Sequence, residues 1–228
     1  KTEKEVEEVI TFIKNNKHIK VKSVFSHLAG SDEPELDEFT QEQFKRFADL
    51  SVQIENAFDY KIDKHILNSA GIERFPDQQM NMVRLGIGLY GISQTGLALQ
   101  QISTLKTTVS QVKTVNTNET VGYNRKGKIK QQSRVAIVPM GYADGINRRL
   151  GNGLGSAFVN GQEARIIGNI CMDMLMLDVT NLEVNPGDKV EIFGPNISIS
   201  KVAQLLETIP YEILTGISQR VKRVYLQE

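Results

Sequence analysis

The sequence has no tryptophan, a single cysteine and no net charge. One cysteine excludes an internal disulfide framework and is typical of a reducing compartment, so we expect a cytoplasmic protein. Lysine plus arginine and aspartate plus glutamate both number 27, and this balance gives no indication of a nucleic-acid partner. No apolar run approaches the ~18–20 residues that a bilayer requires, and the opening segment KTEKEVEEVI has no apolar core of the kind that marks a secretory signal. We therefore expect no membrane partner either.

Several common catalytic motifs are absent as well. The sequence has no GxxxxGK[ST] loop for nucleotide phosphates, no GxSxG turn for a nucleophilic serine, and no HExxH or CxxC pattern for zinc. Its three histidines lie far apart along the chain. We therefore expect no metal site.

Residues 1–98 alternate between helical and strand-like patterns. Apolar residues at helical spacing predict a helix over 3–16, and Thr40 with Gln43 forms a capping-box pattern ahead of a second helix. Three apolar runs, at 21–29, 65–70 and 82–90, are strand-like. This alternation predicts parallel strands as in a β/α barrel, yet a closed barrel of that type requires eight strand–helix units. We therefore expect either an open sheet or a part of a barrel.

From about residue 99 the pattern changes to short runs rich in valine and isoleucine, separated by glycine and asparagine clusters. The predicted fold class is α/β plus all-β. The open sheet or part of a barrel is expected over 1–98, and a mostly antiparallel β domain over 99–228. One short helix is expected at about 201–207. Strands are expected in the runs 105–115, 134–140, 157–159, 165–170, 174–179, 189–193 and 220–226.

Two segments of the first region carry polar residues among apolar ones. His27 ends an apolar run, which places it either at an active-site edge or in a structural role at a strand end. Arg84 lies in an apolar run, where burial is costly without a partner. The glycines that follow it allow backbone N–H groups to approach an anion, and Ser69 adds a hydroxyl. The alternative is that Arg84 forms an ion pair with a local carboxylate such as Asp77.

A third segment, in the second region, is the turn GYADG that contains Tyr142. Small residues on both sides allow the tyrosine hydroxyl to project outward. Because a phenol has an ordinary pKa near ~10, catalytic use requires a neighbouring cation that lowers the pKa. The alternative is a packing role with the hydroxyl in water.

Together and in this order, these segments resemble the alanine racemase family. The resemblance covers nearly the whole chain, and the combination of GYADG with CMDM is its most specific part. The matching segments are SHLA with the acidic loop after it, NSAG, NMVRLGIGLYG, VGYNR (121–125), SRVAIVPMGYADGINRRLGN (133–152), GNICMDMLMLDVT (168–180) and ISQRVKRVY (217–225).

The resemblance implies an eight-stranded β/α barrel that holds pyridoxal 5'-phosphate at its mouth, followed by a β domain. It implies that residues 1–98 form a partial (β/α)8 TIM-type barrel, made of its C-terminal strands and helices, and that residues 99–228 form the β domain. It assigns Arg84 to the pyridine nitrogen of the cofactor and His27, with Asn68 nearby, to the side of the ring. The residues that it assigns to the cofactor phosphate are Ser69, Gly86 and Ile87. In the second region it makes Tyr142 one of two catalytic bases and gives the backbone N–H of Met172 to the substrate carboxylate.

The same resemblance implies a head-to-tail homodimer with active sites shared between subunits. The reaction would be two-base interconversion of L- and D-alanine, which supplies D-alanine for peptidoglycan. Two departures are visible. No segment here matches the family's early strand that carries the cofactor lysine, and Gln219 stands where many members have a tyrosine that contacts the phosphate. We therefore expect a racemase fragment that is inactive alone. The alternatives are a non-catalytic dimerisation or interaction module, and a racemase for serine or a basic amino acid such as lysine.

Overall fold

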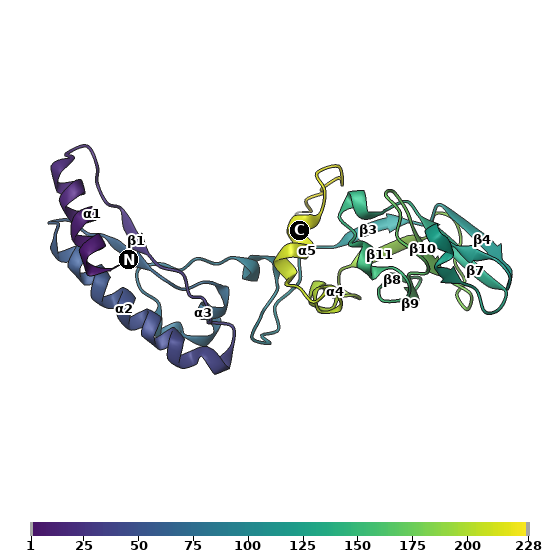
Figure 1. The fold of residues 1–228 in the computed structure, drawn as a ribbon, viewed down its shortest axis with the longest axis horizontal. Helices are drawn as coiled ribbons and strands as arrows, with labels where there is room; N and C mark the ends of the chain where they lie inside the picture. Colours follow the sequence, from purple (N-terminus) through teal and green to yellow (C-terminus); the bar gives the residue numbers. More distant parts are fainter. Residues whose placement is uncertain (1, 227–228) are drawn as a thin grey trace. The chain divides into compact units, whose positions relative to one another are not determined.

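The computed structural model describes residues 2–226 and forms two compact units (Figure 1). The N-terminal unit is Lys1–Gln100 and the C-terminal unit is Gln101–Glu228. The division lies close to the boundary at 98/99 that the change of pattern predicts. Among the described residues no helix combines the length and the apolar character of a membrane span.

The N-terminal unit contains the predicted helices, one of them with a different start. Helix α1 (Glu3–Asn15) confirms the helix expected over 3–16 and begins at a capping box of Thr2 and Glu5. Helix α2 (Asp37–Asn56) begins directly after the 3-10 turn η1 (Pro34–Leu36), so Thr40 and Gln43 lie inside it and the predicted capping box is wrong. The turn that begins at Pro34 leads directly into the helix at Asp37, three residues before the predicted cap at Thr40.

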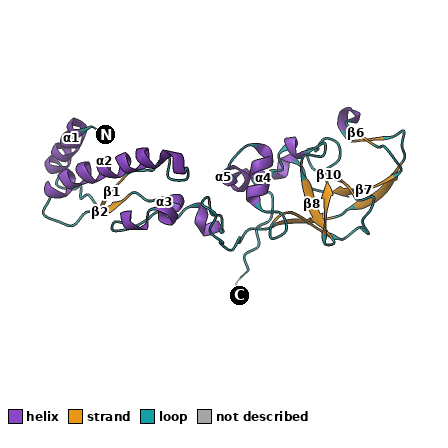
Figure 2. Cartoon of the chain, turned by 90° about the horizontal axis from the view of Figure 1, so that it is seen from below, coloured by secondary structure: helices purple, strands orange, loops and turns teal. Residues whose placement is uncertain are grey.

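Two short strands, β1 (Ser23–Phe25) and β2 (Asp63–His65), pair in parallel with Ser23 opposite Asp63 and Phe25 opposite His65. Helix α2 lies along this pair (Figure 2). Helix α3 (Ser69–Arg74) follows β2, and two 3-10 turns come after it, η2 (Pro76–Gln78) and η3 (Ile87–Tyr90). The core between helices and strands consists of Leu28, Phe44, Phe47, Ile66 and Leu67.

The strand predicted over 82–90 is absent from the described residues. The chain from Asn81 to Arg84 makes only isolated backbone hydrogen bonds to β2 and the residues after it. Asn81 N donates to Lys64 O at 3.1 Å, and Arg84 N donates to Leu67 O at 2.9 Å. The run 65–70 is likewise not a strand beyond His65, because Asn68 caps α3 there. Arg84 therefore lies in an irregular segment, where its side chain is free of the alternation that a strand imposes.

The C-terminal unit is built of antiparallel strands, as predicted. One sheet has the order β10-β7-β4, a second has the order β3-β11-β8-β9, and β5 pairs with β6. The strands are β3 (Leu105–Thr108), β4 (Gln111–Val115), β5 (Thr120–Val121), β6 (Gly127–Lys128), β7 (Ser133–Val138), β8 (Ser156–Val159), β9 (Gln162–Arg165), β10 (Leu175–Asp178) and β11 (Lys189–Phe193).

Helices and turns connect these strands. The 3-10 turns are η4 (Tyr123–Arg125), η5 (Tyr142–Asp144) and η6 (Arg148–Leu150), and the helices are α4 (Ile199–Leu206) and α5 (Pro210–Gly216). Helix α4 confirms the helix expected at about 201–207, while α5 was not predicted. The strand predicted over 220–226 is wrong, because this segment has no strand to pair with and leaves Val224, Tyr225 and Leu226 exposed.

Candidate active site

The guanidinium group of Arg84 is held entirely by neutral acceptors. Its Nη2 lies 2.8 Å from Ser26 O, 3.3 Å from Ile66 O and 3.1 Å from His27 Nδ1. Its Nη1 lies 3.0 Å from His65 Nδ1 and 3.3 Å from His65 O. Among the described residues Arg84 makes no ion pair, so the alternative reading of a local carboxylate partner is wrong.

This arrangement leaves one N–H of Arg84 for a ligand. No described residue accepts from Arg84 Nε, while the two terminal nitrogens are fixed on both sides. Burial lowers the pKa of Arg84 from its ordinary value, but an arginine stays protonated in any protein environment. The Nε–H is therefore a fixed donor that can bind a ring nitrogen and keeps its own proton.

His65 contacts Arg84 and packs on the same aromatic ring as Arg84. Its ring stacks on Phe25 with centroids 5.3 Å apart, and Arg84 lies 5.1 Å above the same Phe25 ring. Burial lowers the pKa of His65, the charge of Arg84 lowers it further, and Asp63 acts in the opposite direction. His65 is therefore neutral at neutral pH, with Nδ1 as an acceptor for Arg84.

We expect the N-terminal unit to lose stability as the pH falls below about 6.5. The folded state holds the pKa of His65 below 6.5, so the unfolded chain takes up the proton first and gains relative to the folded chain. The protection factor of the Arg84 amide, which is its exchange rate corrected for the intrinsic pH dependence of exchange, reports this loss when it is measured between pH 7.5 and 5.5. The dependence is expected to diminish in His65→Asn, which keeps an acceptor near the Nδ1 position, and to persist in His18→Asn. An unchanged pH dependence in His65→Asn contradicts this account.

An anion cradle, formed by Ser69, Gly86, Ile87 and Gly88, lies at the start of α3 and η3. The N–H groups of Gly86 and Gly88 donate to Ser69 Oγ at 3.0 and 3.3 Å. Ile87 is 2 % exposed, and no described residue accepts from its N–H. An unpaired buried N–H is costly, so a bound oxyanion would satisfy it. The Ile87 N–H and the Ser69 hydroxyl are the donors of the cradle that remain for a phosphate.

The run Gly86–Gly91 also has the GxGxxG spacing of dinucleotide-binding loops. That motif requires a preceding strand and a following long helix. Here no described strand leads directly into the run, and η3 is a single 3-10 turn with Gly91 at a left-handed φ of 72°. The spacing therefore does not indicate a dinucleotide site.

His27 and Asn68 border this region in different ways. His27 is exposed and contacts Arg84, which places it beside whatever ligand Arg84 binds. The side chain of Asn68 is already used, because its Oδ1 accepts from Gly71 N and from Ser31 Oγ, both at 2.9 Å. Asn68 therefore fixes the start of α3 and with it the position of Ser69.

Gln43 is a residue of this region that the sequence pattern misassigned. Instead of capping a helix, its side chain accepts from Ala29 N at 3.0 Å and donates to His27 O at 3.2 Å. It thereby ties the loop after β1 to α2. A polar residue on the buried side of an amphipathic helix is the signal that could have indicated this role.

In the C-terminal unit, two turns that lie far apart in sequence are joined directly. Tyr142 N donates to Cys171 O and Ala143 N donates to Met172 O, both at 3.0 Å. Gly141 makes this approach possible, since a Cβ there would lie 2.3 Å from Cys171 O and 2.4 Å from Met172 O. The predicted residues Tyr142 and Met172 are thus brought together. Both are exposed, and no described residue accepts from Met172 N–H.

The tyrosine side chain lines a pocket of the C-terminal unit together with Tyr123, Asn124, Arg148 and Ile170. Tyr123 is 69 % exposed and Tyr142 is 44 % exposed. Tyr123 is followed by Asn124 and Arg125 with left-handed φ of 59° and 53°, a backbone strain that concentrates at functional sites. The sequence interpretation singled out Tyr142 and passed over Tyr123.

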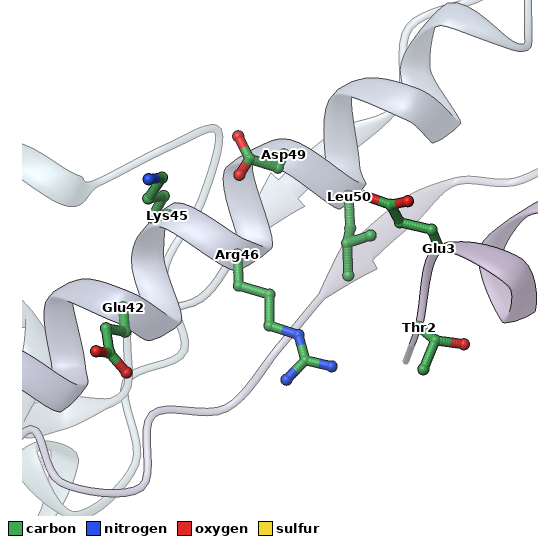
Figure 3. Close-up of a pocket in the computed structure, with 7 residues that line it drawn as sticks. All are labelled: Thr2, Glu3, Glu42, Lys45, Arg46, Asp49 and Leu50. Atoms are coloured by element: carbon green, nitrogen blue, oxygen red, sulfur yellow. The ribbon is translucent and has the colours of Figure 1, made fainter.

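A second pocket lies on the N-terminal unit and contains none of the predicted site residues. Figure 3 shows its lining of α2 side chains with the first residues of α1: Thr2, Glu3, Glu42, Lys45, Arg46, Asp49 and Leu50. No cluster of three or more metal-binding side chains occurs in residues 2–226.

Comparisons with known proteins cover both units. Residues 1–94 match the family model described as alanine racemase, N-terminal domain, and residues 102–225 match alanine racemase, C-terminal domain. Alanine racemase 2 of Caldanaerobacter subterraneus subsp. tengcongensis is 38 % identical over 98 % of this chain and 59 % of the relative. The chain thus spans less than two thirds of that relative's length.

Solved structures give the same result. The alanine racemase of Clostridium difficile 630 in complex with cycloserine superposes with a TM-score of 0.90 at 33 % identity, covering 99 % of this chain and 61 % of that one. The alanine racemase of Bartonella henselae with covalently bound pyridoxal phosphate has a TM-score of 0.84 at 30 % identity, covering 99 % and 62 %.

Proposed function

Because this chain belongs to the alanine racemase family, we propose that it supplies part of the active site of an enzyme that interconverts L- and D-alanine with pyridoxal 5'-phosphate as its cofactor. The observation that carries the proposal is the set of donors without acceptors in the N-terminal unit. The Nε–H of Arg84 and the buried N–H of Ile87 both lack a partner among the described residues.

These donors match the two ends of the cofactor. Ser69 and Ile87 would hold the phosphate through one hydroxyl and one backbone N–H group. The resemblance adds the N–H of Gly86, which donates to Ser69 Oγ in this structure and would have to turn to the phosphate. Arg84 would donate its Nε–H to the pyridine nitrogen, and His27 would lie beside the ring. When bound, the cofactor withdraws electrons from the α-carbon of the amino acid and so makes its hydrogen acidic. Because Arg84 would keep its proton, it would donate a hydrogen bond to the ring nitrogen without protonating it, which would favour proton return over side reactions.

Racemisation requires a proton to leave one face of the α-carbon and another to arrive on the opposite face. We assign one face to a tyrosine of the C-terminal unit, Tyr142 by the sequence interpretation, with Tyr123 as the other tyrosine of the same pocket. The free N–H of Met172 would bind the substrate carboxylate. The resemblance assigns the second base to the cofactor lysine, which lies in a segment that no part of this chain matches.

The wider proposals follow from the same family. They are a cytoplasmic homodimer in which each active site draws residues from both subunits, and a role in supplying D-alanine for peptidoglycan. The rival proposals are a dimerisation or interaction module without catalysis, and a racemase for serine or lysine.

The proposal is tested first on the chain by itself. Pyridoxal phosphate is added, the mixture is reduced with borohydride, and intact mass with peptide mapping locates any modified lysine. We expect no stoichiometric adduct on a defined lysine and no turnover of alanine. A single adduct on one lysine, or robust turnover, would show that this chain holds and uses the cofactor without the unmatched segment.

The second test joins the chain to the unmatched part of the Caldanaerobacter relative. The fusion is expected to racemise alanine, measured as loss of optical rotation. Turnover of serine or lysine in preference to alanine supports the nearer rival. A fusion that dimerises but turns over none of these amino acids supports the interaction module.

A further inference from the structure

Arg220 joins two carboxylates that belong to different turns of the C-terminal unit. Its Nε lies 2.7 Å from Asp144 Oδ1 and its Nη2 lies 2.6 Å from Asp173 Oδ1. We name these three residues the Arg220 bridge. Each nitrogen of the planar guanidinium binds a separate carboxylate, and a lysine cannot reproduce this fork.

The two carboxylates stand next to the residues proposed to act on the substrate. Asp144 closes the turn that contains Tyr142, and its second oxygen accepts from Gly141 N at 2.8 Å. Asp173 directly follows Met172 in sequence. The backbone of the segment that carries Arg220 is held to the same turn, because Ser218 N donates to Asp144 O at 3.1 Å.

The electrostatics of the bridge are those of a strong pair. The side chain of Asp144 is 13 % exposed, although those of Arg220 and Asp173 are 47 % and 57 % exposed. Burial opposes the ionisation of Asp144, but hydrogen bonds from Arg220 and the Gly141 N–H, with the charge of Arg220, outweigh it and hold the pKa of Asp144 below its ordinary value. The bonds to both carboxylates raise the pKa of Arg220.

We propose that Arg220 is a positioning residue, which fixes the turn of Tyr142 against the loop of Met172 and so sets the spacing between tyrosine hydroxyl and substrate carboxylate. The spacing matters only if those two residues act on the substrate, so this inference rests on the proposed function. Arg220 itself touches neither the substrate nor the reacting atoms.

An ordinary surface ion pair in the same unit gives a matched comparison. Lys201 Nζ lies 2.7 Å from Glu163 Oε1, with side chains 45 % and 43 % exposed. Its length resembles those of the Arg220 bridge, and its exposure resembles that of the Arg220–Asp173 half. It contacts neither turn of the site. Exposed pairs of this kind contribute little to stability, so any local effect of Arg220 comes from what it connects.

The test is amide hydrogen exchange on the full chain, without cofactor or substrate. In Arg220→Gln we expect the amides of Tyr142 and Ala143 to exchange roughly tenfold faster, since charge-assisted hydrogen bonds that close the turns are lost. The amides of β7 are expected to exchange at the wild-type rate. Arg220→Lys is expected to fall between, and Lys201→Gln to leave Tyr142 and Ala143 unchanged.

Two results would overturn the inference. Wild-type exchange at Tyr142 and Ala143 in Arg220→Gln would mean that the turns hold together without the bridge. Equal acceleration across β7 and both turns, unrelieved in Arg220→Lys, would mean that Arg220 acts only on global stability. Because exchange needs no turnover, these outcomes are independent of whether the chain takes part in racemisation.

Discussion

Two variants are made, Tyr142→Phe and Tyr123→Phe, and one of them is expected to lower the rate of alanine racemisation by about 10²- to 10⁴-fold. This is the range for loss of a general acid–base group. Phenylalanine keeps the ring and its packing but removes the only atom that can carry the proton. The measurement is the rate of racemisation by the fusion with the Caldanaerobacter part. Exchange of the α-hydrogen with deuterated solvent gives a second readout of the same step.

The pair of variants decides between the two tyrosines. The GYADG turn favours Tyr142, whereas greater exposure and the strained backbone that follows favour Tyr123. The variant that keeps activity within about tenfold identifies a residue that shapes the pocket rather than transferring the proton. Tyr225→Phe is the control, because this side chain is 88 % exposed and lines neither described pocket. Full activity in both pocket variants would remove the tyrosine from the proposed mechanism.

Gly141→Ala is expected to destabilise the C-terminal unit by about 3 kcal/mol, since a new methyl group would be forced against backbone atoms that cannot give way. The Cβ would lie 2.3 Å from Cys171 O and 2.6 Å from Met172 C. Separation of the turns would also break the hydrogen bonds from Tyr142 N and Ala143 N. For a unit of this size the loss corresponds to roughly 10 °C in Tm.

Thermal unfolding followed by circular dichroism measures this effect, and hydrogen exchange of β7 amides assigns the transition to the C-terminal unit. Gly216→Ala is the matched control, because a Cβ there meets no atom within 4 Å. It is expected to leave Tm within about 2 °C. A Gly141→Ala protein with the Tm of the wild type would show that the two turns are not held as closely as described.

The sequence predicted the two kinds of structure in the chain and most strands of the β domain, because alternation and glycine punctuation are local signals. The prediction from sequence failed where the role of a residue depends on a partner that is distant in the sequence. Thr40 and Gln43 have the spacing of a capping box, yet Gln43 is used to bind the backbone at His27 and Ala29, 16 and 14 positions away. The apolar run around Arg84 has the pattern of a strand, but it makes too few backbone hydrogen bonds to a neighbouring strand to form one.

The motifs in the sequence identified several residues of the candidate site, but they did not predict which residues contact one another. Arg84 and Ser69 could be singled out as polar residues among apolar ones. The neutral acceptors that fix Arg84 come from two distant segments, 26–27 and 65–66, and leave no local pattern. Tyr123 lies in VGYNR, a segment that belongs to the resemblance but was given no role. Arg220 was interpreted as the start of a strand, although its side chain instead bonds to Asp144 and Asp173.

The Arg220 bridge also sets an order of events while the chain is being made. Arg220 follows Asp144 by 76 positions, so a ribosome that adds about 5–20 residues per second delivers it roughly 4–15 s later. Asp173 is added within that interval, 47 positions before Arg220, so both carboxylates are present without their common cation for roughly the last 2–9 s. The part of the molecule proposed to carry the chemistry is therefore completed during translation only after most of the β domain around it has emerged.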